Sequence, residues 1–345
     1  MYKVLSRFFT LLLVPVFFSL AGCTESPSSQ SAFVLGTLCT VNLYKQGSAA
    51  LYSAVFSRLQ AIEALMSVTL TGSDVDLINQ NAGHEPVKVH DEVLAVLETA
   101  LQYAELSGGA FDPTVGPLVK LWDIGSETPQ LPSEVAIREA LSRINWRDVF
   151  IDRAAGTVLL KQPGMVLDLG AIAKGYAADE AARILKEARI DGAIIDLGGN
   201  IFAFGAKEGD NRDTVPWRIG VQNPLDERGT YIGVLTVQHK SIVTSGVYER
   251  YADINGVRYH HILSTKDGYP VDNGILSVTI VAASSMDADA LSTTVFTLGY
   301  EKGTALLADL DKVEAVFVFT DKRIRLTKGA ASMFTLTNTE YRIVE

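Results

Sequence analysis

The chain has 345 residues, of which 48% are hydrophobic and 28 are glycine, so it is long and apolar enough for one large α/β domain or two closely packed subdomains and is not a disordered chain. Its 40 acidic and 30 basic residues give a formal net charge of −10, which argues against electrostatic binding to nucleic acid or to anionic lipid. An anionic ligand must therefore be held locally, by a metal ion or by a few donors directed at it.

Residues 1–22 are typical of an export signal. Lys3 and Arg7 precede an apolar stretch, residues 8–20, that is short for a membrane span. The signal leads into LAGC, ending at Cys23, which resembles the bacterial lipobox, whose cysteine thiol receives a lipid. A buried apolar helix is the alternative. We expect the signal to be removed and Cys23 to be lipidated, which places the protein on the periplasmic side of a bacterial membrane, either inner or outer.

Residues 23–32 consist of this cysteine and the polar sequence TESPSSQSA, which has a proline and no apolar periodicity. We predict that they form a flexible tether to a folded domain over residues 33–345. Lipidation of Cys23 would leave Cys39 as the only free thiol, so no intrachain disulfide could form despite the oxidising compartment. The stability of the domain must then come from its core.

The first half of the domain begins with a β-rich segment, residues 33–44. Apolar residues then recur at helical spacing from Leu51 to Leu65, before a break near Gly72. Further along, we predict a helix from an N-cap at Asp91 to a stop at Gly108, a helix from a cap at Ser133 to about Asn145, and two short strands within residues 149–161.

The centre of the chain alternates between strand and helix. Residues 165–169 have the apolar run of a buried strand, residues 171–188 the pattern of a helix, and residues 193–197 that of another strand. This order predicts a βαβ unit and an α/β fold. The remainder is mostly strand, with one helix beginning around Asp287 and another expected over residues 302–309.

The loop from Gly109 to Gly116 packs an acid, a proline and glycines into a short irregular turn. Such a turn can bring backbone amides close to a ligand. A helix exit whose direction is set by proline would have the same sequence, and this is the favoured interpretation of the loop alone. Trp122, downstream of the loop, is expected in the core.

The segment from Asp168 to Gly175, DLGAIAKG, lies where the predicted central strand ends and its helix begins, the usual ligand position in open α/β sheets. Amides at a helix N-terminus attract phosphate, and Lys174 adds a cation in the first turn, an unusual position unless an anion is near. The alternative is an aspartate N-cap with a solvated lysine. The segment matches neither a Walker A loop nor a GxGxxG fingerprint.

Two further glycine turns, residues 196–200 and 244–246, could let a flat ring or a pyrophosphate approach the backbone, but ordinary turns would look identical. His260 and His261 precede another turn. Adjacent residues on a strand point to opposite faces, so both histidines cannot easily bind one metal ion. We expect one of them in a site and the other in the core or in solvent.

Asp289 and Thr293 lie four residues apart in a predicted helix and are therefore neighbours on one face. Two hard oxygens in that arrangement can join backbone carbonyls and phosphate oxygens around Mg²⁺. An ordinary helix start with Asp287 and Asp289 in its acidic first turn explains the two acids equally well.

Six segments, in this order along the chain, resemble the ApbE family of FAD:protein FMN transferases. Each motif is weak alone, but their order and spacing make chance agreement improbable, and the match spans nearly the whole mature chain. The lipoprotein signal is also typical of many members. The segments are GAFDPTVGPLVKLW from Gly109, DLGAIAKGYAAD from Asp168, DLGGN from Asp196, TSGVYERY from Thr244, HHI from His260 and DALSTTVF from Asp289.

The resemblance implies a single α/β domain of two packed subdomains, with the substrate FAD in the cleft between them. The residues that it implies for flavin nucleotide binding are Leu35, Thr69, Ala110, Phe111, Asp112, Asp168, Lys174, Ser245, His261 and Ile262. The groups that it implies for Mg²⁺ are the carbonyl of Ala171 and the side chains of Asp289 and Thr293.

The implied reaction transfers FMN to a threonine or serine hydroxyl of an acceptor protein and releases AMP. Mg²⁺ and Lys174 would neutralise the pyrophosphate in the transition state. Either Asp289 or His261 would accept the hydroxyl proton, and a metal-bound carboxylate is the weaker base. A subunit of a membrane redox complex would suit as the acceptor.

Three positions depart from the family's pattern. Thr69 stands where many members carry a tyrosine that covers the flavin ring, Val247 replaces the aspartate commonly found after Ser-Gly, and Ser264 with Thr265 replaces a frequent Asp-Pro. The missing ring leaves open a Mg²⁺-dependent FAD pyrophosphatase that releases FMN and AMP. A lipoprotein that binds FAD without cleaving it, or that binds another small molecule, is the remaining alternative.

Overall fold

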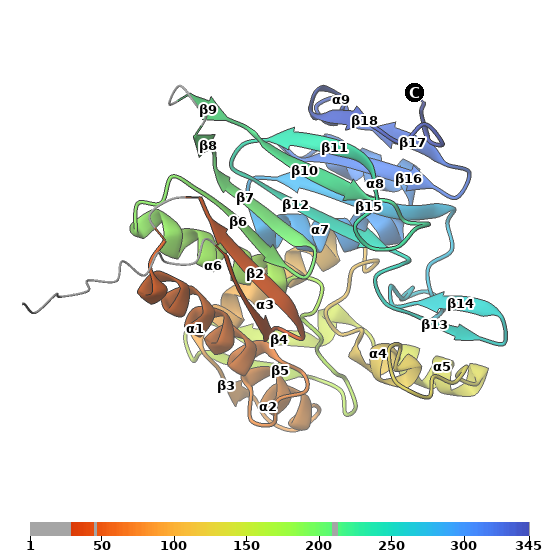
Figure 1. Cartoon of the computed structure of the whole chain (residues 1–345). Helices are drawn as coiled ribbons and strands as arrows, with labels where there is room; N and C mark the ends of the chain where they lie inside the picture. The colour runs from red at the N-terminus through yellow and green to blue at the C-terminus, as the bar shows by residue number, and fades with distance from the viewer. Residues whose placement is uncertain (1–28, 45–46, 209–212, 345) are drawn as a thin grey trace, which may run out of the picture.

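The computed structural model describes residues 29–44, 47–208 and 213–344, and its largest element is a nine-stranded sheet (Figure 1). Neighbouring strands of this sheet are antiparallel except for the last two, which are parallel. In sheet order the strands are β1 (Ser29–Val34), β2 (Thr37–Leu43), β6 (Gly192–Leu197), β7 (Asn200–Gly205), β12 (Lys240–Gly246), β15 (Ile275–Ala282), β16 (Glu314–Phe319), β17 (Arg323–Leu326) and β19 (Arg342–Ile343).

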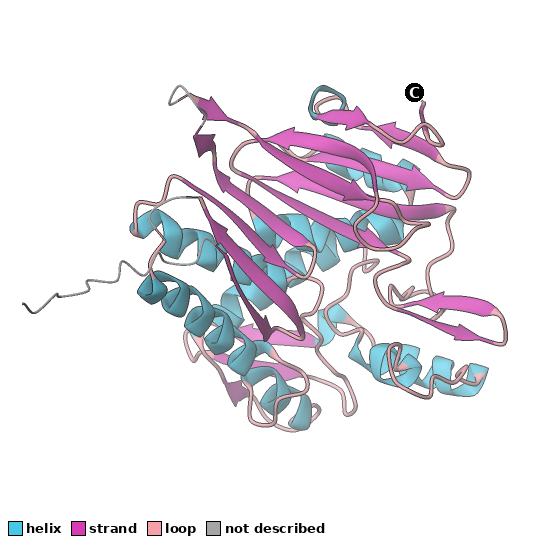
Figure 2. Ribbon diagram, viewed as in Figure 1, coloured by secondary structure: helices cyan, strands magenta, loops and turns pink. Residues whose placement is uncertain are grey.

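Helices cover one face of this sheet (Figure 2). The helix α6 (Ala173–Glu187) packs on β6 and β7, α7 (Ser285–Leu298) packs on β12 and β15, and these two helices lie against each other. Outside them, α1 (Ala49–Met66) packs on α6, and α3 (Asp91–Leu106) packs on α7. The remaining helices are α2 (Asp74–Gln80), α4 (Gly116–Trp122), α5 (Glu134–Leu141), α8 (Tyr300–Ala308) and α9 (Ala330–Met333).

A second sheet of three strands, β10 (Trp217–Gln222), β11 (Tyr231–Val237) and β18 (Phe334–Leu336), covers part of the opposite face. The apolar core between the two sheets includes Val281 and Leu235. The chain is therefore a single α/β domain of packed subdomains, as the resemblance implies. The short strands are β3 (Val87–Lys88), β4 (Val149–Asp152), β5 (Thr157–Leu160), β8 (Lys207–Glu208), β9 (Thr214–Val215), β13 (Tyr251–Ile254) and β14 (Val257–His260).

Several predicted elements are confirmed. The helix expected from Leu51 to Leu65 is α1, α3 ends before Gly108, and the Ser133 hydroxyl caps α5 by accepting from the Ala136 amide. The N-cap of α3 is His90, one residue before the predicted cap at Asp91, which is the first residue of the helix. The short helices α2 and α4 have no counterpart in the prediction.

The strand predicted over residues 165–169 is wrong, and with it the βαβ unit. Within this segment only Val166 forms a single bridge, with Val115, while β6 pairs antiparallel with both β2 and β7. The apolar run is real, since Met165, Leu167 and Leu169 are buried. The Asn79 side chain donates to the Leu167 carbonyl and accepts from its amide, at 3.0 and 2.6 Å, so these backbone groups need no neighbouring strand.

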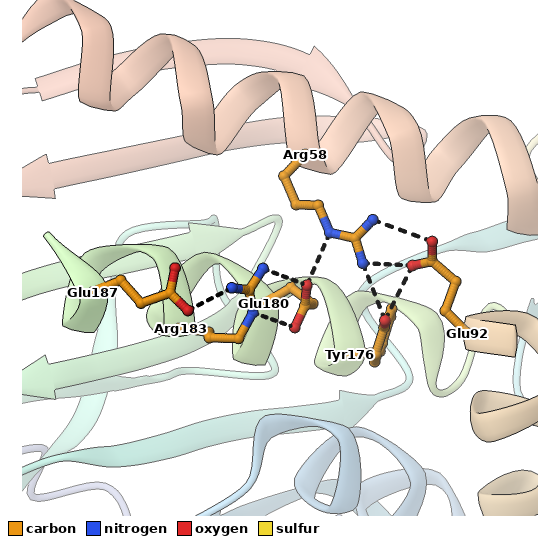
Figure 3. A network of polar contacts seen from close by, with 6 residues as sticks. All are labelled: Arg58, Glu92, Tyr176, Glu180, Arg183 and Glu187. Carbon is orange, nitrogen blue, oxygen red and sulfur yellow. Dashed lines mark hydrogen bonds and ion pairs between the residues drawn. The ribbon is translucent and has the colours of Figure 1, made fainter.

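A polar network fixes α6 against α1 and α3 (Figure 3). The Arg58 guanidinium of α1 donates to Glu92 of α3 at 2.5 Å and to Glu180 of α6 at 2.9 Å. The Tyr176 hydroxyl, also on α6, donates to Glu92 at 3.0 Å. Because these side chains are less than a quarter exposed, the ion pairs are partly shielded from solvent and constrain where α6 begins.

The N-terminal predictions fall mostly outside the described residues, and these include the export signal and Cys23. The first described strand, β1, starts at Ser29, so residues 29–32 belong to the folded domain and not to the predicted tether. No helix in the described part of the chain is long and apolar enough to cross a membrane.

Candidate active site

The first turns of α6 and α7 approach each other more closely than side chains normally allow. A Cβ added to Gly175 would lie 2.2 Å from the Ser285 carbonyl oxygen, so only glycine fits at this contact. The Gly175 amide belongs to the first turn of α6 and donates to Asp289 Oδ2 at 2.9 Å. A carboxylate of α7 thus accepts from a helix N-terminus, where negative charge is favoured.

Asp289 and Lys174 form the charged centre of the site. The Lys174 ammonium donates to the Gly170 carbonyl at 2.9 Å and lies 4.0 Å from Asp289 Oδ1. Asp289 is only 4% exposed, and burial raises the pKa of its carboxyl, against the opposing effects of Lys174 and the Gly175 amide. The lysine charge is therefore held beside a buried acid at the start of a helix.

Hard oxygens continue from Asp289 along α7. Thr293 follows one turn later, and its Oγ1 lies 3.3 Å from Ser245 Oγ, which in turn lies 2.8 Å from Ser292 Oγ. The Ala171 carbonyl, just before α6, accepts no hydrogen bond from the described residues. A free carbonyl, one carboxylate and one hydroxyl make a sparse oxygen set that fits Mg²⁺, which usually keeps several waters and is completed by substrate phosphates.

The described residues contain no cluster of three or more His, Cys, Asp or Glu side chains that could hold a metal ion. The candidate oxygen set has a single carboxylate and belongs to a different class of site.

The two histidines separate as predicted, with His260 in the core. Its Nε2 donates to the Val271 carbonyl at 2.9 Å, and its ring packs edge-on against Phe296. His261 is half-buried, and its Nδ1 lies 3.1 Å from the Arg250 carbonyl. Because a carbonyl only accepts, Nδ1 carries the proton and Nε2 keeps a free lone pair.

Burial lowers the pKa of His261 to about 3, and the nearby charges of Arg250 and Lys174 lower it further. The imidazole is therefore neutral at physiological pH. Ile262, the next residue, is buried, and its amide donates to His260 Nδ1 at 3.2 Å. We call residues 260–265, which carry both histidines and Ile262, the His261 wall.

The loop of residues 109–116 joins this wall to the α6 segment. The Thr265 hydroxyl donates to the Gly109 carbonyl at 2.7 Å, and the Asp168 amide donates to the Pro113 carbonyl at 2.8 Å. The Asp168 carboxylate accepts from the Gly170 amide at 2.7 Å. The structure thus brings three predicted segments together that are far apart in the sequence.

Within that loop, Asp112 has a structural role that the sequence does not indicate. Its Oδ1 accepts from the amide and hydroxyl of Thr114 at 2.8 and 2.7 Å, and its Oδ2 accepts from the Trp146 amide at 3.1 Å. Both oxygens are thus bound by protein donors. Phe111 is buried beside Tyr103, while Ala110 is half-buried. Trp122 is buried, as predicted.

No hydrogen bond among the described residues connects Leu35 or Thr69 to the Asp289 group. Leu35 occupies the turn between β1 and β2 with a φ of 56° and packs partly against the main core. Thr69 is exposed in the connection between α1 and α2, with its hydroxyl 3.0 Å from Ser67 Oγ.

Two residues of the site's framework were not identified from the sequence. Asp179, in the middle of α6, caps α7 by accepting from the amides of Ser285 and Met286 at 2.8 and 2.9 Å. Asn200 is buried and accepts from the Ser285 hydroxyl at 2.8 Å. In the sequence, Asp179 is only the acid that ends the segment DLGAIAKGYAAD. That segment gives no indication that Asp179 contacts α7.

Comparison with known proteins connects this arrangement to a family. The model of the ApbE family matches residues 35–317. An FAD:protein FMN transferase of Treponema pallidum is 44% identical over 314 residues, covering 87% of each chain, and one of Klebsiella pneumoniae is 37% identical, covering 92% of this chain and 97% of its own.

Solved structures agree with the sequence comparison. The ApbE protein of Thermotoga maritima superposes with a TM-score of 0.79 at 33% identity, covering 88% of this chain and 98% of its own. The flavin transferase ApbE of Vibrio cholerae gives a TM-score of 0.78 at 29% identity with the same coverage. The chain belongs to the ApbE family.

Proposed function

We propose that the chain is an FAD:protein FMN transferase that uses Mg²⁺ to move FMN from FAD onto a threonine or serine hydroxyl of an acceptor protein, releasing AMP. The observation that carries the proposal is the buried Asp289 carboxylate beside Lys174 at the N-terminus of α6. The relatives named FAD:protein FMN transferase support the reaction. An acidic chain needs such a local arrangement to hold a pyrophosphate.

The charges of the site suit phosphoryl transfer. The acceptor oxygen attacks the FMN phosphorus, the bond from that phosphorus to the bridging oxygen breaks, and AMP leaves with the bridging oxygen. Lys174 and the first-turn amides of α6 would stabilise the negative charge of the phosphates. Bound Mg²⁺ would be held by Asp289, Thr293 and the Ala171 carbonyl and would neutralise further charge on the pyrophosphate.

His261 is the better of the two candidates for the general base. Its free Nε2 can accept the hydroxyl proton, whereas Asp289 already accepts from Gly175 and faces Lys174. The low pKa of His261 in the free protein would make it a weak base. Bound phosphates would raise that pKa, because their negative charge offsets the nearby cations.

One assay separates the transferase from its alternatives. The purified protein is incubated with FAD and Mg²⁺, with and without a candidate acceptor, and AMP, free FMN and covalently bound flavin are measured. We expect AMP in amounts equal to covalent flavin, and little of either without acceptor. Free FMN and AMP without acceptor would indicate a pyrophosphatase, and FAD binding without AMP would indicate a binding protein.

We also propose that the protein is a lipoprotein held at the periplasmic side of a bacterial membrane through Cys23, where a subunit of a membrane redox complex would be the acceptor. The lipobox-like sequence supports this, and only residues 24–28 separate Cys23 from β1. We expect Cys23→Ser to shift the protein out of the membrane fraction without loss of transferase activity in solution. Unchanged membrane fractionation of that variant would contradict the lipid anchor.

A further inference from the structure

Asn200 begins β7, directly after the glycine turn that follows β6, and its side chain is 2% exposed. In the preceding turn, Gly198 and Gly199 have φ values of 70° and 99°, and the Gly199 amide donates to Asp196 Oδ1 at 2.8 Å. The turn therefore delivers an amide side chain into the interior, underneath the first turns of α7.

A chain of two serines fixes which way this amide faces. The Ser241 hydroxyl donates to Ser285 Oγ at 2.8 Å, and the Ser285 hydroxyl donates to Asn200 Oδ1 at 2.8 Å. Ser241 and Ser285 are themselves fully buried. Because Ser285 has one proton and directs it at Oδ1, the Nδ2 group of Asn200 must point the other way.

The Nδ2 group of Asn200 is buried and forms no hydrogen bond of standard geometry in the described structure. Leaving a buried donor unpaired is unfavourable, so an acceptor beside it would stabilise the group. Ser285, which binds Oδ1, stands one helical turn before Asp289 in α7, so the buried Asp289 carboxyl lies on the same face of the helix as the bonded serine. The Asn200 amide accordingly helps to lower the pKa of that carboxyl against the effect of burial.

The other partners of Asp289 come from α6. The Gly175 amide holds Oδ2, and Lys174 lies 4.0 Å from Oδ1. Asn200 differs from both because it approaches from the sheet side, as part of β7. The carboxylate is thus placed between the start of one helix and the end of a β-turn, and its remaining lone pairs are left for a ligand.

We propose that Asn200 is a positioning residue, whose Nδ2 group holds the Asp289 carboxylate in the orientation that binds Mg²⁺. The proposal rests on the function proposed above. When the metal and FAD are bound, Lys174 is drawn toward the phosphates and Asp289 loses that partner. The Asn200 amide, anchored through Ser285 to Ser241, then keeps the carboxylate from rotating away, as outer-shell donors do for other metal ligands.

The test measures how much Mg²⁺ strengthens FAD binding, by flavin fluorescence in EDTA and in excess Mg²⁺. Asn200→Leu keeps the approximate volume of the side chain and removes the donor. We expect its FAD affinity in EDTA to stay within about two-fold of the wild type, and the gain from Mg²⁺ to fall by roughly ten-fold or more. The Mg²⁺ concentration needed for half-maximal AMP release should rise by a similar factor.

Ser241→Ala is the matched control, since it removes a buried hydroxyl of the same hydrogen-bonded series and leaves the bond from Ser285 to Asn200 Oδ1 in place. We expect this variant to keep most of the gain from Mg²⁺. If these hydrogen bonds have a purely structural role, both variants should melt at a lower temperature and both should keep the wild-type gain in FAD affinity from Mg²⁺. That result would overturn the inference. If Asn200→Leu does not fold, Asn200→Ser, one carbon shorter and without the amide, is measured in the same way. A wild-type protein with no gain from Mg²⁺ would overturn the proposed metal dependence itself, and the inference with it.

Discussion

At the scale of single residues, the site depends on a carboxylate that is buried and yet surrounded by donors. Burial raises the pKa of Asp289, whereas Lys174, the Gly175 amide and Asn200 lower it. These partners come from two separate stretches of chain, the start of α6 and the start of β7. A buried acid with its own donors is a costly arrangement in a core and is typical of functional sites.

Thr69 is the position at which the resemblance to the family implies that a ring covering the flavin is missing. Its side chain is exposed and makes only a hydrogen bond to Ser67, so a larger side chain meets little resistance. If the flavin ring lies beside it, Thr69→Tyr should tighten FAD binding by about 0.5–1.5 kcal/mol, the energy of one aromatic stacking contact. That is roughly a two- to twelve-fold lower dissociation constant.

Isothermal titration with FAD measures this change, and Thr69→Val is the control, because it removes the hydroxyl without adding a ring. Release of FMN and AMP to water should also slow in the tyrosine variant, since the ring holds the nucleotide in place. Equal affinities for Thr69→Tyr and Thr69→Val would show that this position does not face the flavin.

Helical spacing was sufficient to predict the pair of Asp289 and Thr293 and the placement of Lys174 at a helix start. The roles of Asp179 and Asn200 could not be predicted in this way. Each acts on α7 from another element, and a contact between residues more than 80 positions apart leaves no local periodicity. The structural role of Asp112 could not be predicted for the same reason, because one donor to its carboxylate is the amide of Trp146, 34 positions away.

At the scale of elements, the position of α6 decides whether Lys174 and the Gly175 amide meet Asp289. The network around Arg58 links α6 to α1 and α3 (Figure 3). Removing the guanidinium would leave Glu92 and Glu180 without their shared cation in a partly buried place.

We therefore expect Arg58→Met to lower the free energy of unfolding by about 1–3 kcal/mol, between the values typical of exposed and of buried ion pairs. Urea denaturation measures this change. Arg153→Met is the matched control, because Arg153 pairs with Glu98 at the surface, and it should have a clearly smaller effect. Equal losses in the two variants would show that the network adds no more than a surface pair.

The element prediction that failed, the strand over residues 165–169, shows why burial alone does not identify a strand. A short apolar run indicates that side chains face the core, and Met165, Leu167 and Leu169 do so. It does not indicate which groups form hydrogen bonds with the backbone of the segment. Here the Asn79 side chain and the loop at Pro113 provide those groups, and no sequence rule for strands includes such a partner.

At the scale of the whole molecule, the nine-stranded sheet carries the helices that form the charged centre. The loop of residues 109–116 and the wall with His261 come from segments outside that sheet. The class of fold was predictable because the chain alternates between helical and strand patterns. The sheet order was not, since it joins strands that are distant in the sequence, as where β2 pairs with β6 and β7 with β12.

The measurement that tests the central claim most directly is a crystal structure of the protein with FAD and Mn²⁺, in which anomalous scattering locates the metal. We predict a peak at roughly 2.0–2.2 Å from Asp289, Thr293 and the Ala171 carbonyl, with the FAD phosphates beside Lys174. A different position would contradict the account. The clearest such result would be nucleotide in the open depression of about 420 Å³ further along α6, lined by Lys186, Phe204 and His239, with no metal at Asp289.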